Sequence, residues 1–106
     1  MTDSGIVFMT ASSREEAEKI ANSLVEKRLA ACVQIISEIK SVYWWEGKIC
    51  DEKEVFFTAK TTAGLFPELA SEVKALHSYE VPEIVFVPIQ DGQKDYMDWI
   101  SGVTKK

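Results

Sequence analysis

Two long extended segments joined by a tight turn constrain the fold more than any other feature. Residues 31–45 are rich in β-branched and aromatic side chains, residues 49–61 alternate in polarity, and Glu46-Gly47 supplies a hairpin turn between them. Strands in globular proteins are usually about 5–6 residues long. A strand of about 15 residues spans roughly 50 Å, whereas the radius of gyration expected for such a chain is only about 13 Å. We therefore expect the hairpin to bend sharply or to project beyond its own core.

The tip of this hairpin is apolar, with Val42, Tyr43, Trp44, Trp45 and Ile49 beside the turn. Such side chains form an exposed hydrophobic patch unless another surface covers them. The tip could fold back onto its own subunit, or it could be buried against a neighbouring copy. We favour the second arrangement, because cyclic closure also pairs the exposed strand edges. The sequence thus predicts a homo-oligomer in which Tyr43, Trp44 and Trp45 lie at an interface.

The turn also predicts the strand register, with Trp45 opposite Lys48 and Cys50 opposite Tyr43. Cys32 then lies opposite about Thr61. This register places the two cysteines roughly 36 Å apart, which is far beyond the reach of a disulfide.

The remaining segments predict two further strands and three helices. Apolar runs at residues 6–9 and 84–89 are typical of strands, and Pro88 indicates that the second lies at a sheet edge. Ser12 and Ser13 are each followed three residues later by a glutamate, Glu15 and Glu16, and this capping-box pattern predicts the start of a helix that runs to about Arg28. Apolar residues at helical spacing predict the other helices at residues 66–76 and 96–103. The order predicts an α+β, ferredoxin-like βαββαβ sandwich with a long central hairpin and a C-terminal helix.

Composition excludes several classes of function. The 106 residues fit one domain, and no apolar run is long enough to span a membrane. A net charge of −5 without a basic stripe argues against nucleic acid as a partner. The first residues are polar and lack a basic region of the signal-peptide type, so we expect a cytoplasmic protein. No phosphate loop, nucleophile elbow or Cys-x-x-Cys motif is present, and we do not expect an enzyme.

Residues 77–83 form the stretch richest in reactive side chains, with His77, Tyr79, Glu80 and Glu83. Imidazole and carboxylate groups together suit copper or zinc. Alternatively, His77 caps the preceding helix, Tyr79 packs into an interface, and the two glutamates are solvated.

Two charged residues of the second hairpin strand, Glu54 and Lys60, are expected on its outward face. They could pair with each other, line a polar cleft between subunits, or simply face solvent.

Several segments in order resemble the CutA divalent-cation tolerance family. They are Leu29-Ala30-Ala31-Cys32-Val33, Ser41-Val42-Tyr43-Trp44-Trp45-Glu46-Gly47-Lys48-Ile49, Lys60-Thr61, His77-Ser78-Tyr79-Glu80-Val81-Pro82-Glu83 and Tyr96-Met97-Asp98-Trp99-Ile100. The resemblance implies a ferredoxin-like fold, a homotrimer, a cytoplasmic location and a link to copper or other divalent cations. It also implies a shape similar to that of the trimeric PII proteins, which bind effectors between subunits.

The metal site implied by the resemblance combines a cysteine at the end of the first strand with two adjacent histidines. This sequence has Met9 at the first position and Leu76-His77 at the pair. His77 is therefore the main candidate ligand, with Met9, Glu80 and Glu83 as weaker candidates.

Three hypotheses of function follow. The first is a homotrimeric divalent-cation tolerance protein with a metal ion bound at His77. The second is a PII-like sensor that binds a small molecule in inter-subunit clefts lined by Trp45, Lys60, Tyr79 and Glu83. The third is a stable trimer that anchors a partner protein.

Overall fold

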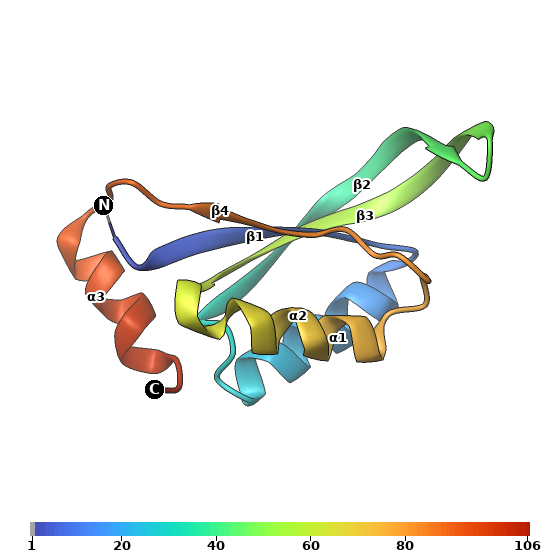
Figure 1. Cartoon of the computed structure of the whole chain (residues 1–106). Helices are drawn as coiled ribbons and strands as arrows, with labels where there is room; N and C mark the ends of the chain where they lie inside the picture. The colour runs from blue at the N-terminus through green and yellow to red at the C-terminus, as the bar shows by residue number, and fades with distance from the viewer. Residues whose placement is uncertain (1) are drawn as a thin grey trace.

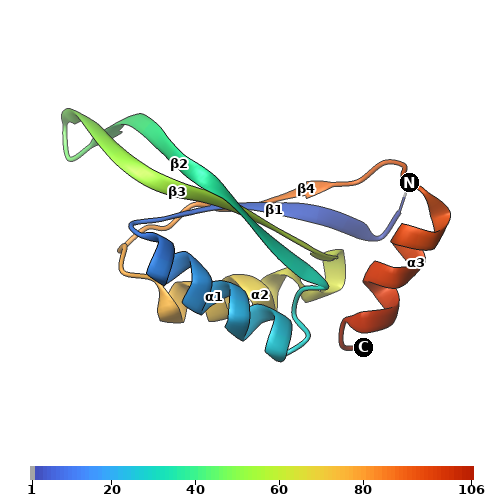
Figure 2. The same ribbon diagram turned by 180° about the vertical axis from the view of Figure 1, so that it is seen from behind.

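A four-stranded antiparallel sheet with two helices on one face forms the body of the protein (Figures 1 and 2). The computed structural model describes residues 2–106. The strand order is β2-β3-β1-β4, which confirms the predicted ferredoxin-like arrangement. The elements are β1 (Ser4–Ala11), α1 (Arg14–Glu26), β2 (Cys32–Trp45), β3 (Lys48–Thr62), a 3-10 turn (Ala63–Leu65), α2 (Phe66–Leu76), β4 (Ile84–Pro88) and α3 (Lys94–Val103).

The hydrophobic core lies between the sheet and the layer formed by α1 and α2. Every second residue of β1 and β3 points toward the helices, because side chains alternate between the two faces of a strand. The core consists mainly of Val7, Met9, Ala11, Ala17, Ile20, Leu24, Val55, Phe57, Ala59, Leu69 and Val73. No helix within residues 2–106 is long and apolar enough to cross a membrane.

The observed strand β1 is longer than its predicted range of residues 6–9. It covers eight residues because β3 pairs with it from Ser4 to Ala11 on one side, while β4 pairs with Gly5 to Met9 on the other. Its polar ends, Ser4 and Thr10, are buried in this ladder. The length of an apolar run therefore underestimates the length of a central strand, whose backbone N–H and C=O groups form hydrogen bonds with neighbouring strands on both sides.

The β2–β3 hairpin projects from the body of the molecule, as its length predicts (Figures 1 and 2). The strands have 14 and 15 residues, and the molecule is 44 Å long but only 25 and 23 Å in its other dimensions. The predicted pairs Trp45–Lys48 and Tyr43–Cys50 are confirmed. Cys32 lies opposite Lys60 rather than Thr61, because a bulge between Ile35 and Ser37 adds one residue to β2. Both cysteines are free.

Glu16 connects the start of α1 to the segment that follows α2. The hydroxyl of Ser13 accepts a hydrogen bond from the Glu16 backbone N–H at 3.1 Å, as the capping box predicts. The Glu16 carboxylate accepts one bond from the Ser12 backbone N–H at 3.0 Å and another from the Ser78 backbone N–H at 2.7 Å. Burial raises the pKa of Glu16, but the hydrogen bonds from Ser12 and Ser78 outweigh it and hold the pKa below its usual value. The carboxylate therefore fixes where residues 77–83 begin.

Replacing Glu16 with Gln should destabilise the fold by about 1–2 kcal/mol at neutral pH, because an amide cannot accept at both ends. The pKa of Glu16 is lowered in the folded state, so its contribution is present above the unfolded pKa and is lost as pH falls through the folded pKa. The free energy of unfolding, measured in urea at fixed protein concentration, should thus be higher for the wild type than for Glu16→Gln at neutral pH. This difference should shrink at acidic pH. Glu15→Gln, at an exposed position one residue away, is the matched control. If Glu16→Gln and Glu15→Gln changed the free energy of unfolding equally, at neutral and at acidic pH alike, this role of Glu16 would be refuted.

Candidate functional site

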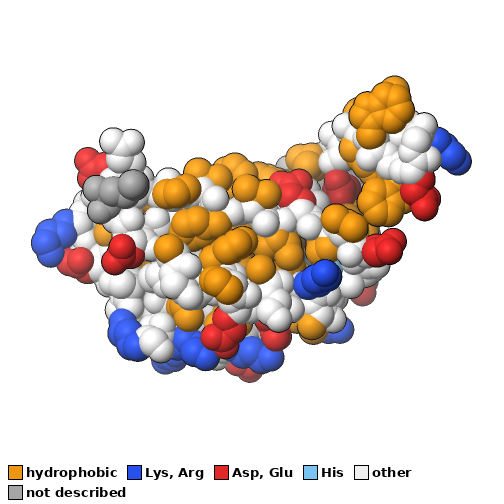
Figure 3. Space-filling view, in the orientation of Figure 1, with side chains coloured by type: hydrophobic (Ala, Val, Ile, Leu, Met, Phe, Trp, Pro, Cys, Tyr) orange, Lys and Arg blue, Asp and Glu red, His pale blue; other side chains and the backbone are white. Residues whose placement is uncertain are grey.

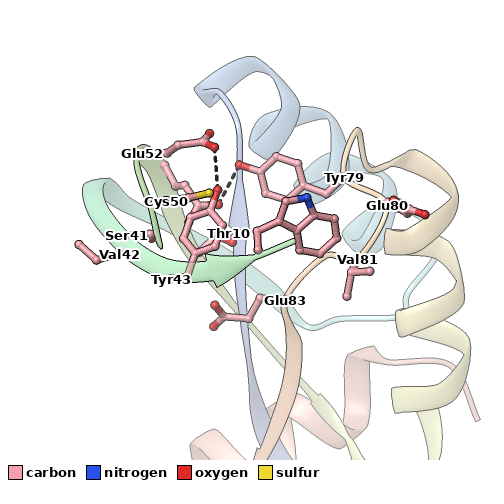
Figure 4. A pocket seen from close by; sticks show the side chains of 12 residues that line it. Thr10, Ser41, Val42, Tyr43, Cys50, Glu52, Tyr79, Glu80, Val81 and Glu83 are labelled. Atoms are coloured by element: carbon pink, nitrogen blue, oxygen red, sulfur yellow. Dashed lines mark hydrogen bonds between the residues drawn. The ribbon is translucent and has the colours of Figure 1, made fainter. Parts of the chain in front are cut away.

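A cavity of about 550 Å³ lies between the outer part of the hairpin and the segment that follows α2 (Figure 4). We call it the hairpin pocket. Its walls come from one residue of β1, from β2 and β3, and from residues 79–83. The lining residues are Thr10, Ser41, Val42, Tyr43, Trp45, Cys50, Glu52, Glu54, Tyr79, Glu80, Val81 and Glu83.

Strand alternation brings the hairpin residues of the pocket together. Tyr43 and Trp45 share one face of β2, while Cys50, Glu52 and Glu54 share the matching face of β3. This face is opposite to that of Phe57 and its core neighbours, so it points away from α1 and α2. Tyr79 and Glu83 reach the same space from the segment anchored by Glu16. Trp45, Tyr79 and Glu83 were predicted, together with Lys60, to line a cleft between subunits. The structure brings the first three to this pocket within one chain.

Two phenol–carboxylate hydrogen bonds organise the pocket. The Tyr79 hydroxyl donates to Glu54 Oε2 at 2.8 Å, and the Tyr43 hydroxyl donates to Glu52 Oε1 at 2.6 Å. Burial and the bond to Glu54 raise the pKa of Tyr79 well above its usual range. The bond to Glu52 raises the pKa of Tyr43 to about 12. Both phenols consequently remain protonated and act as donors at physiological pH.

The pocket is strongly acidic. Four glutamates line it, and none of its lining residues is Lys or Arg. In Figure 4, Glu83 extends toward Tyr43, whereas the carboxylate of Glu80 points away from Tyr43. Glu54 is only 8% exposed, and the Tyr79 phenol is its hydrogen-bond partner. Since burying a carboxylate beside other carboxylates is unfavourable, this environment favours an incoming cation.

Glu54 and Lys60 do not form the pair that was considered from the sequence. Lys60 donates instead to Gln34 Oε1, on the paired strand. It lies roughly 20 Å from Glu54 along β3, and it does not line the hairpin pocket. Of the alternatives considered for Glu54, simple exposure to solvent does not hold, because Tyr79 folds over it and it lines the hairpin pocket.

His77 lies at the end of α2, where both of its ring nitrogens form hydrogen bonds. Nδ1 accepts from the Tyr79 backbone N–H at 3.1 Å, so Nε2 carries the proton and donates to the Thr10 carbonyl at 2.7 Å. Neither nitrogen offers a free lone pair to a metal ion. The helix-capping alternative considered from the sequence matches this position.

The other candidate metal ligands are dispersed. Met9 is 0% exposed within the apolar core, Glu80 is exposed, and Glu83 lines the hairpin pocket. Within residues 2–106, no three His, Cys, Asp or Glu side chains are grouped so that they could hold a metal ion. The residues around Met9 and His77 therefore do not fit the metal site that the family resemblance implies.

Sequence reasoning missed Cys50 and Glu52 as pocket residues. A signal was nevertheless present, because Cys50, Glu52 and Glu54 follow one another at a spacing of two on a predicted strand. What could not be inferred was that residues 79–83 close over this face.

Comparisons with known proteins agree with this fold. The sequence profile described as "CutA1 divalent ion tolerance protein" matches residues 5–103, and this description names no chemical reaction. The divalent-cation tolerance protein CutA of Thermus thermophilus is 47% identical over 95 residues, which are 90% of this chain and 92% of the relative. The solved Thermus structure superposes with a TM-score of 0.94 at 45% identity, covering 96% of this chain and 99% of that one.

A second solved structure, from Archaeoglobus fulgidus, has a TM-score of 0.93 at 47% identity and covers 96% of this chain and 99% of its own. That structure is described as a periplasmic divalent cation tolerance protein, so a cytoplasmic location for this chain stays a prediction. Profile, sequence identity and superposition all extend over nearly the whole length. The chain therefore belongs to the CutA1 divalent ion tolerance family.

Proposed function

We propose that this chain acts as a homotrimer that binds divalent cations, copper among them, through the carboxylates of the hairpin pocket. The observation that carries the cation part is the pocket itself, which has four glutamates and no basic lining residue. The family description, divalent ion tolerance, supports the same ligand class. Because the glutamates do not form a preorganised cluster within one chain, we expect weak binding.

Two separate apolar surfaces support the trimer. One lies on the sheet face opposite the helices and includes Phe8, Val85 and Val87. The other is at the hairpin tip, where Trp44 is 71% exposed beside its cross-strand partner Ile49. Figure 3 shows hydrophobic side chains gathered over the body and again at the tip.

These two surfaces are different patches of one chain. A contact between the tip of one copy and the sheet face of the next is heterologous, and such contacts form a closed ring when the rotation from one copy to the next closes. Three copies is the number that the family resemblance implies. A ring would also cover the open edges of β2 and β4, which are the outer strands of the sheet.

A second candidate function is a PII-like sensor that binds a small molecule in the hairpin pocket. The size and walls of the cavity favour it. A volume of about 550 Å³ far exceeds one metal ion, and three aromatic residues, Tyr43, Trp45 and Tyr79, form much of the lining. Cavities of roughly 300–1,000 Å³ with aromatic walls are typical of organic ligands.

The trimer predicts that charge at either apolar surface weakens assembly. Trp44→Lys and Val85→Glu should each lower the mass measured by light scattering on dilution, because each buries a charge at the proposed contact. Val25→Lys, at an exposed apolar position of α1, is the control and should leave the mass unchanged. A wild-type protein that is monomeric at micromolar concentration would contradict the proposal.

Titration calorimetry with Cu²⁺ and Zn²⁺ tests the cation site. Replacing Glu54 and Glu83 together with Gln should abolish most of the binding heat, because it removes two carboxylates while preserving side-chain size. His77→Ala should bind as wild type does, since both imidazole nitrogens are already hydrogen bonded. The reverse pattern, with binding lost only in His77→Ala, would indicate that the metal ion binds at His77 and not in the hairpin pocket.

A further inference from the structure

We propose that the hairpin pocket binds a small organic ammonium ion that has N–H donors, such as an alkylamine or a diamine. This inference rests on the second candidate function and names its ligand class. Three properties of the pocket lead to it: the charge of its lining, the burial of Glu54, and the aromatic residues beside the carboxylates.

The charge of the lining selects a cation. Glu52, Glu54 and Glu83 supply negative charge, and no Lys or Arg lines the cavity to offset it. An anionic or neutral metabolite would leave these carboxylates uncompensated, and an anion would also be repelled. The ligand class is therefore positively charged.

The position of Glu54 selects a cation that can donate hydrogen bonds. Its carboxylate is largely buried, and the Tyr79 phenol occupies Oε2. A carboxylate can accept several hydrogen bonds, so Oε1 retains capacity. A charge-assisted bond from an ammonium N–H is stronger than a neutral one and would compensate the burial of this charge.

The aromatic lining favours an organic cation over a bare metal ion. Tyr43, Trp45 and Tyr79 line the same space as the carboxylates. Ammonium groups are attracted to the faces of such rings, and the alkyl part of an amine can pack against Val42 and Val81. A tightly bound metal ion instead needs several oxygen ligands at about 2.0–2.6 Å, and residues 2–106 contain no such cluster of His, Cys, Asp or Glu.

The test is calorimetric titration of the native, assembled protein with 1,4-diaminobutane at low ionic strength. Saturable binding is expected for the diamine. The uncharged isostere 1,4-butanediol and the dianion glutarate should give no saturable heat. Tetramethylammonium, which lacks N–H donors, should bind at least tenfold more weakly.

Variants locate the binding site. Glu54→Gln and Glu83→Gln should each weaken diamine binding about tenfold or more, since each removes a carboxylate from the lining. Glu46→Gln, at the exposed turn and outside the pocket, is the matched control and should bind as wild type does. Circular dichroism and light scattering confirm that each variant is folded and assembled, and the second glutamate variant replaces the first if one fails to fold.

The outcomes separate this inference from the function on which it rests. Equal binding of the diol and the diamine, or unchanged diamine affinity in both glutamate variants, would overturn the ammonium assignment while leaving a small-molecule pocket in place. An absence of diamine binding would also overturn the assignment. If, in addition, a library of neutral and anionic metabolites gave no thermal shift while Cu²⁺ or Zn²⁺ did, the small-molecule candidate itself would fail.

Discussion

The hydrogen-bonded ladder between β2 and β3 is the interaction on which the rest of the structure depends. Its inner half completes the sheet that covers the core, where Phe57 packs against the helices. Its outer half extends past that core and carries the pocket residues on one face and the exposed Trp44 on the other. Because both halves belong to the same two continuous strands, the core fixes the position of the tip. The bulge between Ile35 and Ser37 separates them and adds local twist at the point where the hairpin leaves the body.

Electrostatics give the outer half its chemical character. The phenols of Tyr43 and Tyr79 remain protonated, so they hold Glu52 and Glu54 in place without neutralising them. Negative charge thus remains in a partly enclosed space with aromatic walls. The same property supports metal cations and organic cations as ligands, and the two differ in what they require: preorganised oxygen ligands for the first, and ring faces with a hydrogen-bond acceptor for the second.

Predictions from the sequence succeeded where a single segment decides the outcome. The turn at Glu46-Gly47 determined the pairing of Trp45 with Lys48, and the capping pattern located the N-cap of α1 to within one residue, at Ser12 or Ser13. They failed where two segments meet. The partner of Cys32 differs by one residue because nothing local in β2 marks the bulge, and Glu54 is buried because Tyr79, from a distant segment, covers it. His77 illustrates the same point: its residue type fits a metal ligand, but its two hydrogen bonds come from the fold.

The sequence by itself determined the family, the order of strands and helices, and a hairpin longer than its core, since these follow from periodicity, turn residues and motifs along one stretch of chain. Only the tertiary structure decided what the reactive side chains do. It engaged His77 in hydrogen bonds, placed Met9 in the core, and brought the carboxylates of β3 against Tyr79 to form an acidic pocket. The physical reason is that burial and pairing of polar groups depend on which distant segments cover them, whereas strand and helix formation depend largely on near neighbours.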